Sequence, residues 1–176
     1  MASNRVFALP LLHSSEPSLI RVEADQGTYD LHVCVRFRLE RALFAGELEV
    51  RDLPGAWDEA YQRTLGLTPR DAAQGVLQDI HWSMGAFGYF PTYTLGNLIA
   101  AQLFAAARRD LGDLDAAFAC GEFQPLLEWL RTRVHAHGSL YTADELVRRA
   151  TGRALASDDY LALRRAELAE YYGVAV

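Results

Sequence analysis

Apolar residues recur at the helical period along most of this chain, and this periodicity limits its possible folds more than any other feature. Spacings of three and four residues place side chains on one side of an α-helix. The clearest such face, within residues 95–111, carries Leu98, Ile99, Gln102, Leu103 and Ala106. Gly112 follows, as is typical of the residue after a helix, because glycine adopts the left-handed conformation without strain. Residues 95–111 are therefore predicted to be helical.

Residues 28–45 permit two interpretations. Every second residue from Tyr29 to Leu39 is apolar, as in a strand. A helical stripe is also present, made by Leu31, Val35, Leu39, Ala42 and Leu43. A strand of this length would be far outside the usual range, and the Arg, Glu, Leu and Ala content of the second half favours a helix. We therefore expect a helix that stops at Gly46.

Further helices are predicted from the same pattern and from signals at helix ends. They cover approximately residues 57–65, 71–78, 114–119, 123–137, 142–152 and the region after Ser157. Thr142 and Glu145 have the spacing of a capping box, in which each side chain accepts a hydrogen bond from the other residue's backbone. Residues 46–51 allow a short β-element, because Leu48 and Val50 alternate there. The predicted class is all-α, as a single helical domain.

Composition narrows the possible partners and the location of the protein. The chain has 176 residues, 51% of them hydrophobic, which suits one domain with one core. Its formal net charge is −6 with dispersed acidic groups, so nucleic acid is not expected as a partner. No apolar run approaches the roughly 20 residues that span a bilayer, and the start does not resemble a signal peptide. Cys34 and Cys120 are far apart in sequence, which fits a reducing, cytoplasmic location without a membrane partner.

Few residues have the spacing that catalysis or metal binding requires. None of the five histidines forms a His-x-x-x-His pair, and His135 and His137 would diverge by about 200° on a helix. No Gly-x-Ser-x-Gly sequence is present. Asp79 and His81 are spaced so that a carboxylate and an imidazole could work together in acid-base chemistry, although a helix-end aspartate and a core histidine are the alternative. Residues 82–91 form an aromatic loop that is expected to pack down or to line a cleft.

Two segments carry a resemblance to a known family. Residues 17–25 read PSLIRVEAD and resemble an Ile-Arg-x-x-Ala-Asp motif, and residues 75–82 read GVLQDIHW and resemble a Gly-x-x-Gln-Asp-x-His-Trp motif. Both belong to the carboxypeptidase Taq family of zinc carboxypeptidases, and the likeness covers about residues 16–172. The resemblance implies the helical C-terminal half of that fold, as a domain of residues 16–176 after a divergent segment of residues 1–15. The family's zinc-binding His-Glu-x-x-His half has no counterpart in this sequence.

The resemblance also implies roles for particular side chains. Arg21 would bind the carboxylate at the end of a peptide substrate, while His81 and either Tyr89 or Tyr93 would donate hydrogen bonds to the scissile carbonyl. Residues in supporting positions would be Asp25, Gln78, Asp79 and Trp82. The alternatives are a surface ion pair of Arg21 with Asp25 or Glu23, and simple aromatic packing of the tyrosines.

These expectations lead to three functional hypotheses. The first is an interaction or regulatory protein that holds no zinc or other cofactor, is inactive alone and pairs with a full-length carboxypeptidase. The second is the substrate-binding half of a split or truncated zinc carboxypeptidase, active only with the missing half. The third is a module that binds the C-termini of peptides. A homodimer is also expected, both from the family and from apolar faces that the missing half would cover.

Overall fold

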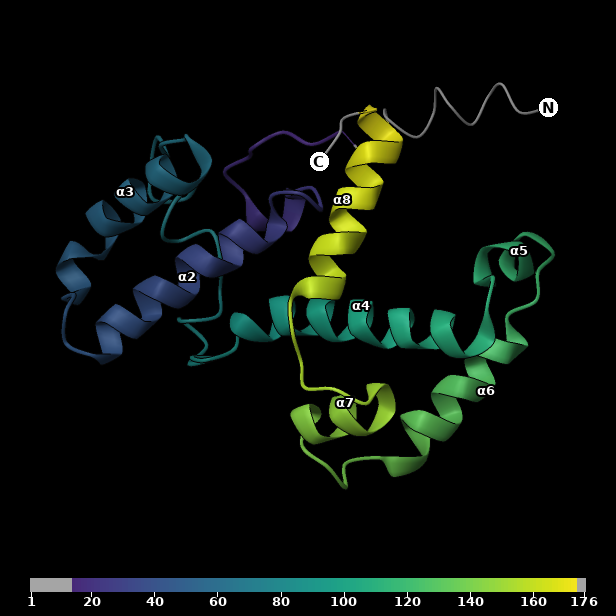
Figure 1. Cartoon of the computed structure of the whole chain (residues 1–176). Helices are drawn as coiled ribbons and strands as arrows, with labels where there is room; N and C mark the ends of the chain where they lie inside the picture. Colours follow the sequence, from purple (N-terminus) through teal and green to yellow (C-terminus); the bar gives the residue numbers. More distant parts are fainter. Residues whose placement is uncertain (1–13, 174–176) are drawn as a thin grey trace. The chain divides into compact units, whose positions relative to one another are not determined.

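The computed structural model describes residues 14–173 and is built from α-helices, short 3-10 helices and turns, with no strand in that range (Figure 1). The elements are η1 (Arg21–Glu23), α2 (Tyr29–Phe44), η2 (Val50–Asp52), α3 (Leu53–Leu65), α4 (Pro91–Leu111), α5 (Leu114–Ala119), α6 (Gln124–Arg133), η3 (His135–His137), α7 (Ala143–Thr151) and α8 (Asp158–Tyr172). The all-α prediction is confirmed. Residues 1–13 of the segment expected to diverge lie outside this description.

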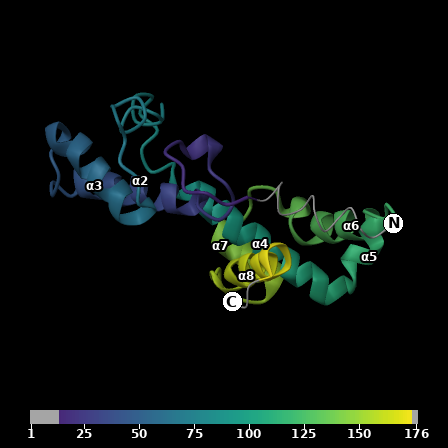
Figure 2. The same cartoon turned by 90° about the horizontal axis from the view of Figure 1, so that it is seen from above.

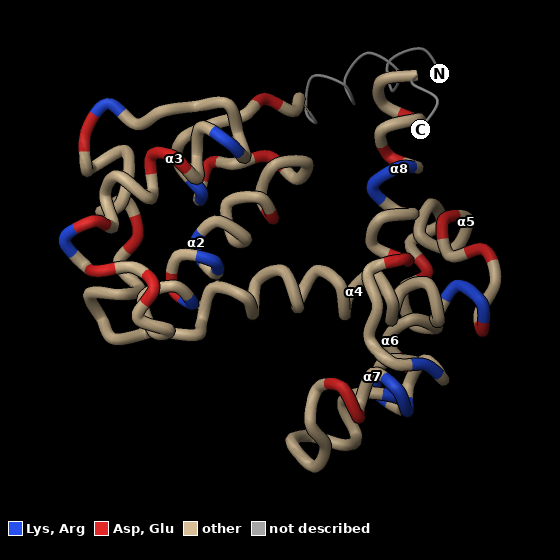
Figure 3. The backbone as a smooth tube through the Cα atoms, turned by 60° about the vertical axis from the view of Figure 1, so that its left-hand side comes forward, with Lys and Arg blue, Asp and Glu red and all other residues tan. Residues whose placement is uncertain are grey.

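The described residues form two compact units, residues 14–95 with 168–173, and residues 96–167. Each unit has its own cluster of buried side chains, whereas one core was expected from the length of the chain. Both signs of charge occur in each unit (Figure 3). Within residues 14–173, no helix combines the length and the apolar content needed to cross a bilayer.

The first unit is built around the pair α2 and α3, which lie side by side in both views (Figures 1 and 2). The buried side chains of its core come from these two helices and are Val35, Leu39, Leu53, Trp57, Tyr61 and Leu65. The helix predicted between residues 28 and 45 is thus confirmed. Helix α3 starts earlier than expected, because Pro54 lies in its first turn, where its missing N–H is not needed. It ends at Gly66, whose φ is +74°.

Two local predictions in the first unit were wrong. Residues 71–78 form turns instead of a helix, and the 3-10 helix η2 stands where a β-element near 46–51 was allowed. Asp71 Oδ1 accepts from the Gln74 N–H as a helix cap would. At Gly75, however, the backbone passes so close to Pro69 that a Cβ would lie 3.3 Å from the proline Cβ. This close approach explains why glycine stands at position 75 of the turn segment, residues 71–78.

The second unit contains most of α4, all of α5, α6, η3 and α7, and most of α8. Its buried cluster consists of Ala106, Ala107, Leu114 and Trp129. The Nε1–H of Trp129 donates to Asp110 Oδ2 over 2.8 Å, which ties α6 to α4. The capping box is present, since Thr142 Oγ1 accepts from the Glu145 N–H and Glu145 Oε2 accepts from the Thr142 N–H. The helix predicted for residues 123–137 is shorter than expected and ends in η3.

Candidate functional site

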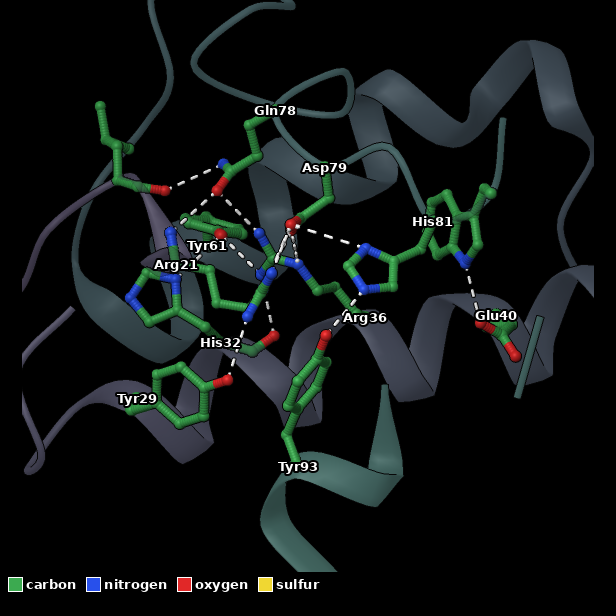
Figure 4. A network of polar contacts seen from close by, with 12 residues as sticks. Arg21, Tyr29, His32, Arg36, Glu40, Tyr61, Gln78, Asp79, His81 and Tyr93 are labelled. Atoms are coloured by element: carbon green, nitrogen blue, oxygen red, sulfur yellow. Dashed lines mark hydrogen bonds and ion pairs between the residues drawn. The ribbon is translucent and has the colours of Figure 1, made fainter. Parts of the chain in front are cut away.

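The two motifs of the sequence meet in the first unit, in a polar network centred on the carboxylate of Asp79 (Figure 4). Arg21 of η1 donates from Nη2 to Asp79 Oδ1 over 2.7 Å, and its Nε also donates to this carboxylate. Arg36 of α2 donates from Nε to the other carboxylate oxygen over 2.6 Å. The side chains of Arg21 and Asp79 are only 7% and 10% exposed. One carboxylate therefore bridges two guanidinium groups that are almost sealed from water.

Gln78 fastens the segments that carry these charges. Its Oε1 accepts from the Arg21 N–H over 3.0 Å and from Arg36 Nη2 over 2.7 Å. Its Nε2 donates to the backbone carbonyl of Leu19 over 2.9 Å. The amide thus holds η1, α2 and the turn segment together, which agrees with the supporting position expected for Gln78.

Arg21 does not form the surface pair with Asp25 or Glu23 that was considered from the sequence. Nε and Nη2 face Asp79, Nη1 donates to the Tyr29 hydroxyl over 3.0 Å, and the guanidinium carbon lies 4.9 Å from the centre of the Tyr93 ring. Within the described part of the chain, these contacts use three of the five N–H donors of the guanidinium. A further carboxylate would have to use the remaining donors on Nη1 and Nη2.

Asp25 has a local structural role at the start of α2. Its carboxylate accepts hydrogen bonds from the N–H groups of Gly27 and Thr28, over 2.7 and 3.1 Å. These bonds satisfy backbone donors ahead of the first helical turn. Burial opposes ionisation of Asp25, but hydrogen bonds from Ser15, Thr28 and Gly27 outweigh it and lower the pKa of the carboxyl.

His81 and Tyr93 form a hydrogen-bonding pair beside Arg21. The Nε2 atom of His81 is 3.0 Å from the Tyr93 hydroxyl, whereas Nδ1 has no hydrogen bond to any of residues 14–173 and lies 3.8 Å from Asp79 Oδ1. Tyr89 stacks obliquely at 5.8 Å between ring centres and is half exposed. Burial lowers the pKa of His81, with Asp79 opposing, so the imidazole is neutral at neutral pH. Both tyrosine rings lie near the imidazole, and Tyr93 is the one whose hydroxyl is within hydrogen-bond distance of His81.

Trp82 closes the network on the side of α2. Its Nε1–H donates to Glu40 Oε2 over 2.8 Å, and the other oxygen of Glu40 accepts from the Gly88 N–H. The buried Glu40 carboxylate therefore ties α2 to the start and to the middle of the aromatic loop. Phe90 is buried as expected for a loop that packs down, but Met84, Phe87 and Tyr89 are 70%, 48% and 50% exposed, so the expectation holds only for part of residues 82–91.

Sequence reasoning missed the residues of α2 that complete the network. His32, Arg36 and Glu40 are buried and lie four residues apart, so they form one polar stripe along the helix. Tyr61 of α3 faces this stripe, because its hydroxyl accepts from Arg36 Nη1 over 2.8 Å and is 3.0 Å from His32 Nδ1. Three ionisable residues at this spacing within an apolar helix were the signal that could have revealed them.

Burial and charge give the network unusual protonation equilibria. Burial, and then the nearby charge of Arg36, lower the pKa of His32 from 6.5 to about 4. Burial alone would raise the pKa of Asp79, but the hydrogen bonds and charges of Arg21 and Arg36 outweigh it and lower the pKa. Near neutral pH the network therefore contains a neutral His32, an ionised Asp79 and two charged arginines.

Comparison with known proteins decides the family. Residues 5–168 match the family described as Carboxypeptidase Taq (M32) metallopeptidase. The chain belongs to this family. The resemblance seen in the two sequence motifs is thereby confirmed.

Curated M32 relatives are much longer than this chain. Thermostable carboxypeptidase 1 of Thermus thermophilus is 54% identical over 162 residues, which are 92% of this chain and 32% of that protein. Carboxypeptidase 1 of Bacillus subtilis is 46% identical over 82% of this chain and 29% of its own length. The chain thus spans about a third of the curated relatives it matches.

Solved M32 structures contain the same fold. The M32 carboxypeptidase of Deinococcus radiodurans superposes with a TM-score of 0.90 at 47% identity, over 92% of this chain and 33% of that one. Metallocarboxypeptidase 1 of Trypanosoma cruzi superposes with a TM-score of 0.84 at 40% identity, over 92% of this chain and 34% of its own.

The zinc implied by the family does not fit the residues described. Among residues 14–173, no group of three His, Cys, Asp or Glu side chains lies close enough to hold a metal ion. In the network, His81 Nδ1 lies 3.8 Å from Asp79 Oδ1. The Asp79 carboxylate, however, already forms ion pairs with Arg21 and Arg36. The network can bind and orient polar groups, but its donor set does not match a zinc site.

Proposed function

We propose that this chain binds the C-terminal carboxylate of peptides at Arg21 and does not hydrolyse them by itself. In this role it acts as an interaction or regulatory protein related to M32 carboxypeptidases. His81 and Tyr93 orient the peptide by hydrogen bonds to the carbonyl oxygen that precedes the terminal residue.

The unused N–H donors of Arg21, one on Nη1 and one on Nη2, carry this proposal. The carboxylates of the network are already engaged, since Asp79 is hydrogen-bonded to both arginines and Glu40 accepts from Trp82 and from Gly88. Water screens charges poorly where side chains are this well enclosed. A peptide carboxylate on the two remaining donors of Arg21 would form charge-assisted hydrogen bonds.

Hydrolysis requires chemistry that these residues do not supply. In zinc peptidases, about three protein ligands hold the metal and leave a position for a water molecule whose pKa the metal lowers. The 176 residues contain no His-Glu-x-x-His sequence. Arg21, His81 and Tyr93 can position a peptide, but none of them is an activated nucleophile.

A second candidate function is favoured by the lengths of the relatives. The chain keeps the M32 fold, with a TM-score of 0.90, over only 33% of the Deinococcus radiodurans enzyme. It would then be the substrate-binding part of a zinc carboxypeptidase that is active only when the remaining part is supplied. Both candidates share the binding of a peptide carboxylate and differ in whether a partner restores hydrolysis.

Isothermal titration calorimetry with two peptides tests the shared step. One peptide ends in a free carboxylate, and the other has the same sequence and a C-terminal amide. We expect the acid to bind about 10 to 100 times more tightly, since a hydrogen-bonded charge pair contributes about 1.5–3 kcal/mol. Equal affinities would overturn the proposal.

A pair of matched variants locates the carboxylate in the same experiment. Arg21→Lys keeps the charge but loses the planar fork, and it should remove most of the preference for the acid. Arg51→Lys changes an exposed arginine that pairs with Glu49 on the surface, and it should leave the preference unchanged. Circular dichroism checks that both variants are folded.

A further inference from the structure

Residues 77–84, which continue the turn segment, carry two kinds of side chain. The residues specified by the motif, Gln78, Asp79, His81 and Trp82, point inward and make the hydrogen bonds and ion pairs described above. Three positions that the motif does not specify lie before, between and after them and are exposed. These are Leu77, Ile80 and Met84, at 71%, 65% and 70%.

These outward side chains are held in place. Met84 N–H donates to the Ile80 carbonyl over 3.0 Å, and Leu77 N–H donates to the Ala72 carbonyl over 2.8 Å. The inward side chains hold the same backbone from the other side, mainly through the ion pairs of Asp79 with Arg21 and Arg36. Single exposed apolar residues are common on protein surfaces, but three within eight positions of a fastened segment are typical of an interface.

We infer that the face formed by Leu77, Ile80 and Met84 is a docking surface for the part of the M32 fold that this chain does not match. Relatives with the same fold are about three times as long, so the shared third is found together with a further two thirds of a polypeptide. The inference rests on the proposed function, in which this chain interacts with other polypeptides of the M32 family, and on its second candidate, in which the remaining part is supplied separately. It uses residues outside the peptide-binding network.

The physical argument for an apolar partner follows from the side chains themselves. The face offers two branched aliphatic residues and a methionine, and none of the three can form an ion pair. Burial of such side chains against a complementary surface contributes about 25 cal/mol for each Å² removed from water. Because the backbone beneath them is already fixed, little ordering of the segment opposes docking.

Co-expression with a defined fragment tests the inference. The fragment is the portion of the Deinococcus radiodurans M32 carboxypeptidase that this chain does not match. We expect the two polypeptides to co-purify as a 1:1 complex. Failure to co-purify would overturn the inference.

Surface variants then assign the interface. The double variant Leu77→Glu with Ile80→Glu should weaken the complex about 100-fold, since it would bury two charges in an apolar contact. Leu140→Glu is the matched control, because Leu140 is 73% exposed in the second unit, and it should change the affinity less than about threefold. Circular dichroism of each variant checks folding. A complex indifferent to the double variant would overturn the inference, as would a homodimer that the double variant breaks.

Two readouts separate this inference from the proposed function. The double variant should bind the peptide acid as tightly as the unchanged chain, because Leu77 and Ile80 are 71% and 65% exposed, whereas the side chains of the Asp79 network point inward. Loss of fragment binding with retention of peptide binding supports both proposals. Peptide binding without any fragment complex supports the proposed function and overturns the docking surface.

Discussion

Arg36 Nε lies 2.6 Å from Asp79 Oδ2 and joins the middle of α2 to a turn segment 43 residues later in the chain. The guanidinium is completely buried, with Trp57 at 4.7 Å from its central carbon. A charge in such a place is tolerated only when it is paired and hydrogen-bonded. The pair therefore controls the stability of the first unit as well as the charge of the site.

Asp79→Asn should lower the free energy of unfolding by about 3 kcal/mol or more, because it leaves two enclosed arginines without a counter-charge. Urea denaturation monitored by circular dichroism measures the change. Asp115→Asn is the control, since Asp115 pairs with Arg108 on the exposed surface and should cost less than about 1 kcal/mol. Similar losses for the two variants would contradict the role assigned to Asp79.

The helices could be predicted largely from sequence because their signals are local. The apolar stripe of α4, the capping box at Thr142 and the glycine after α3 each act within a few residues. Residues 71–78 were mispredicted because their conformation depends on Gly75 passing Pro69 and on Gln78 reaching Leu19. Contacts between distant segments override local propensity, and a single sequence does not display them.

Only part of the candidate site could be predicted from the sequence. The family motifs identified Arg21, Gln78 and Asp79, and the structure brings these three together. Arg36 was treated as a helix-favouring residue, and its four-residue spacing from His32 and Glu40 was overlooked. Its partner lies far along the chain, so the pairing becomes evident only after the chain has folded.

Stability should fall in mild acid because His32 is buried in its neutral form. The pKa of His32 is about 4 in the folded chain, compared with 6.5 for an imidazole exposed to water in the unfolded chain. As the pH drops, the unfolded chain therefore binds a proton before the folded chain does. The stabilising contribution is complete above pH 6.5 and is lost between about 6.5 and 4. It amounts to about 3 kcal/mol, since each unit of pKa difference corresponds to about 1.4 kcal/mol.

Urea titrations at a series of pH values measure this effect. His32→Gln keeps a hydrogen-bonding side chain but does not titrate, so it should flatten the curve between pH 6.5 and 4. His135 is exposed, and His135→Gln is the matched control for the substitution itself. An unchanged slope in His32→Gln would refute the assignment. Loss of stability below that window is expected from Asp79, whose lowered pKa means that it is protonated only in stronger acid.

Gln102→Ala should destabilise the second unit by about 2–3 kcal/mol. The buried amide donates to Thr151 Oγ1 and to the Ala154 carbonyl, and it accepts from the Ala156 N–H, each over 3.0 Å. Removing it would leave buried backbone groups without partners. Thermal unfolding measures the change, with Gln124→Ala on the exposed side of α6 as the control. A shift in melting temperature no larger than that of the control would count against the assignment.

Tyr93→Phe should weaken binding of the peptide acid about fivefold, because it removes one hydrogen-bonding hydroxyl beside Arg21. Tyr89→Phe is the matched control, since the Tyr89 hydroxyl has no hydrogen bond within residues 14–173 and its ring is half exposed. Calorimetry with the same peptide compares the two variants. If Tyr89→Phe had the larger effect, the roles of the two tyrosines would have to be exchanged.

The central claim is that the chain binds peptides without cleaving them, and mass spectrometry tests it most directly. A peptide shown by calorimetry to bind is incubated with the purified chain and added zinc, and then with added cobalt. We expect the peptide to remain intact in both cases. Release of its C-terminal amino acid that persists through purification and disappears in Arg21→Lys would contradict the claim.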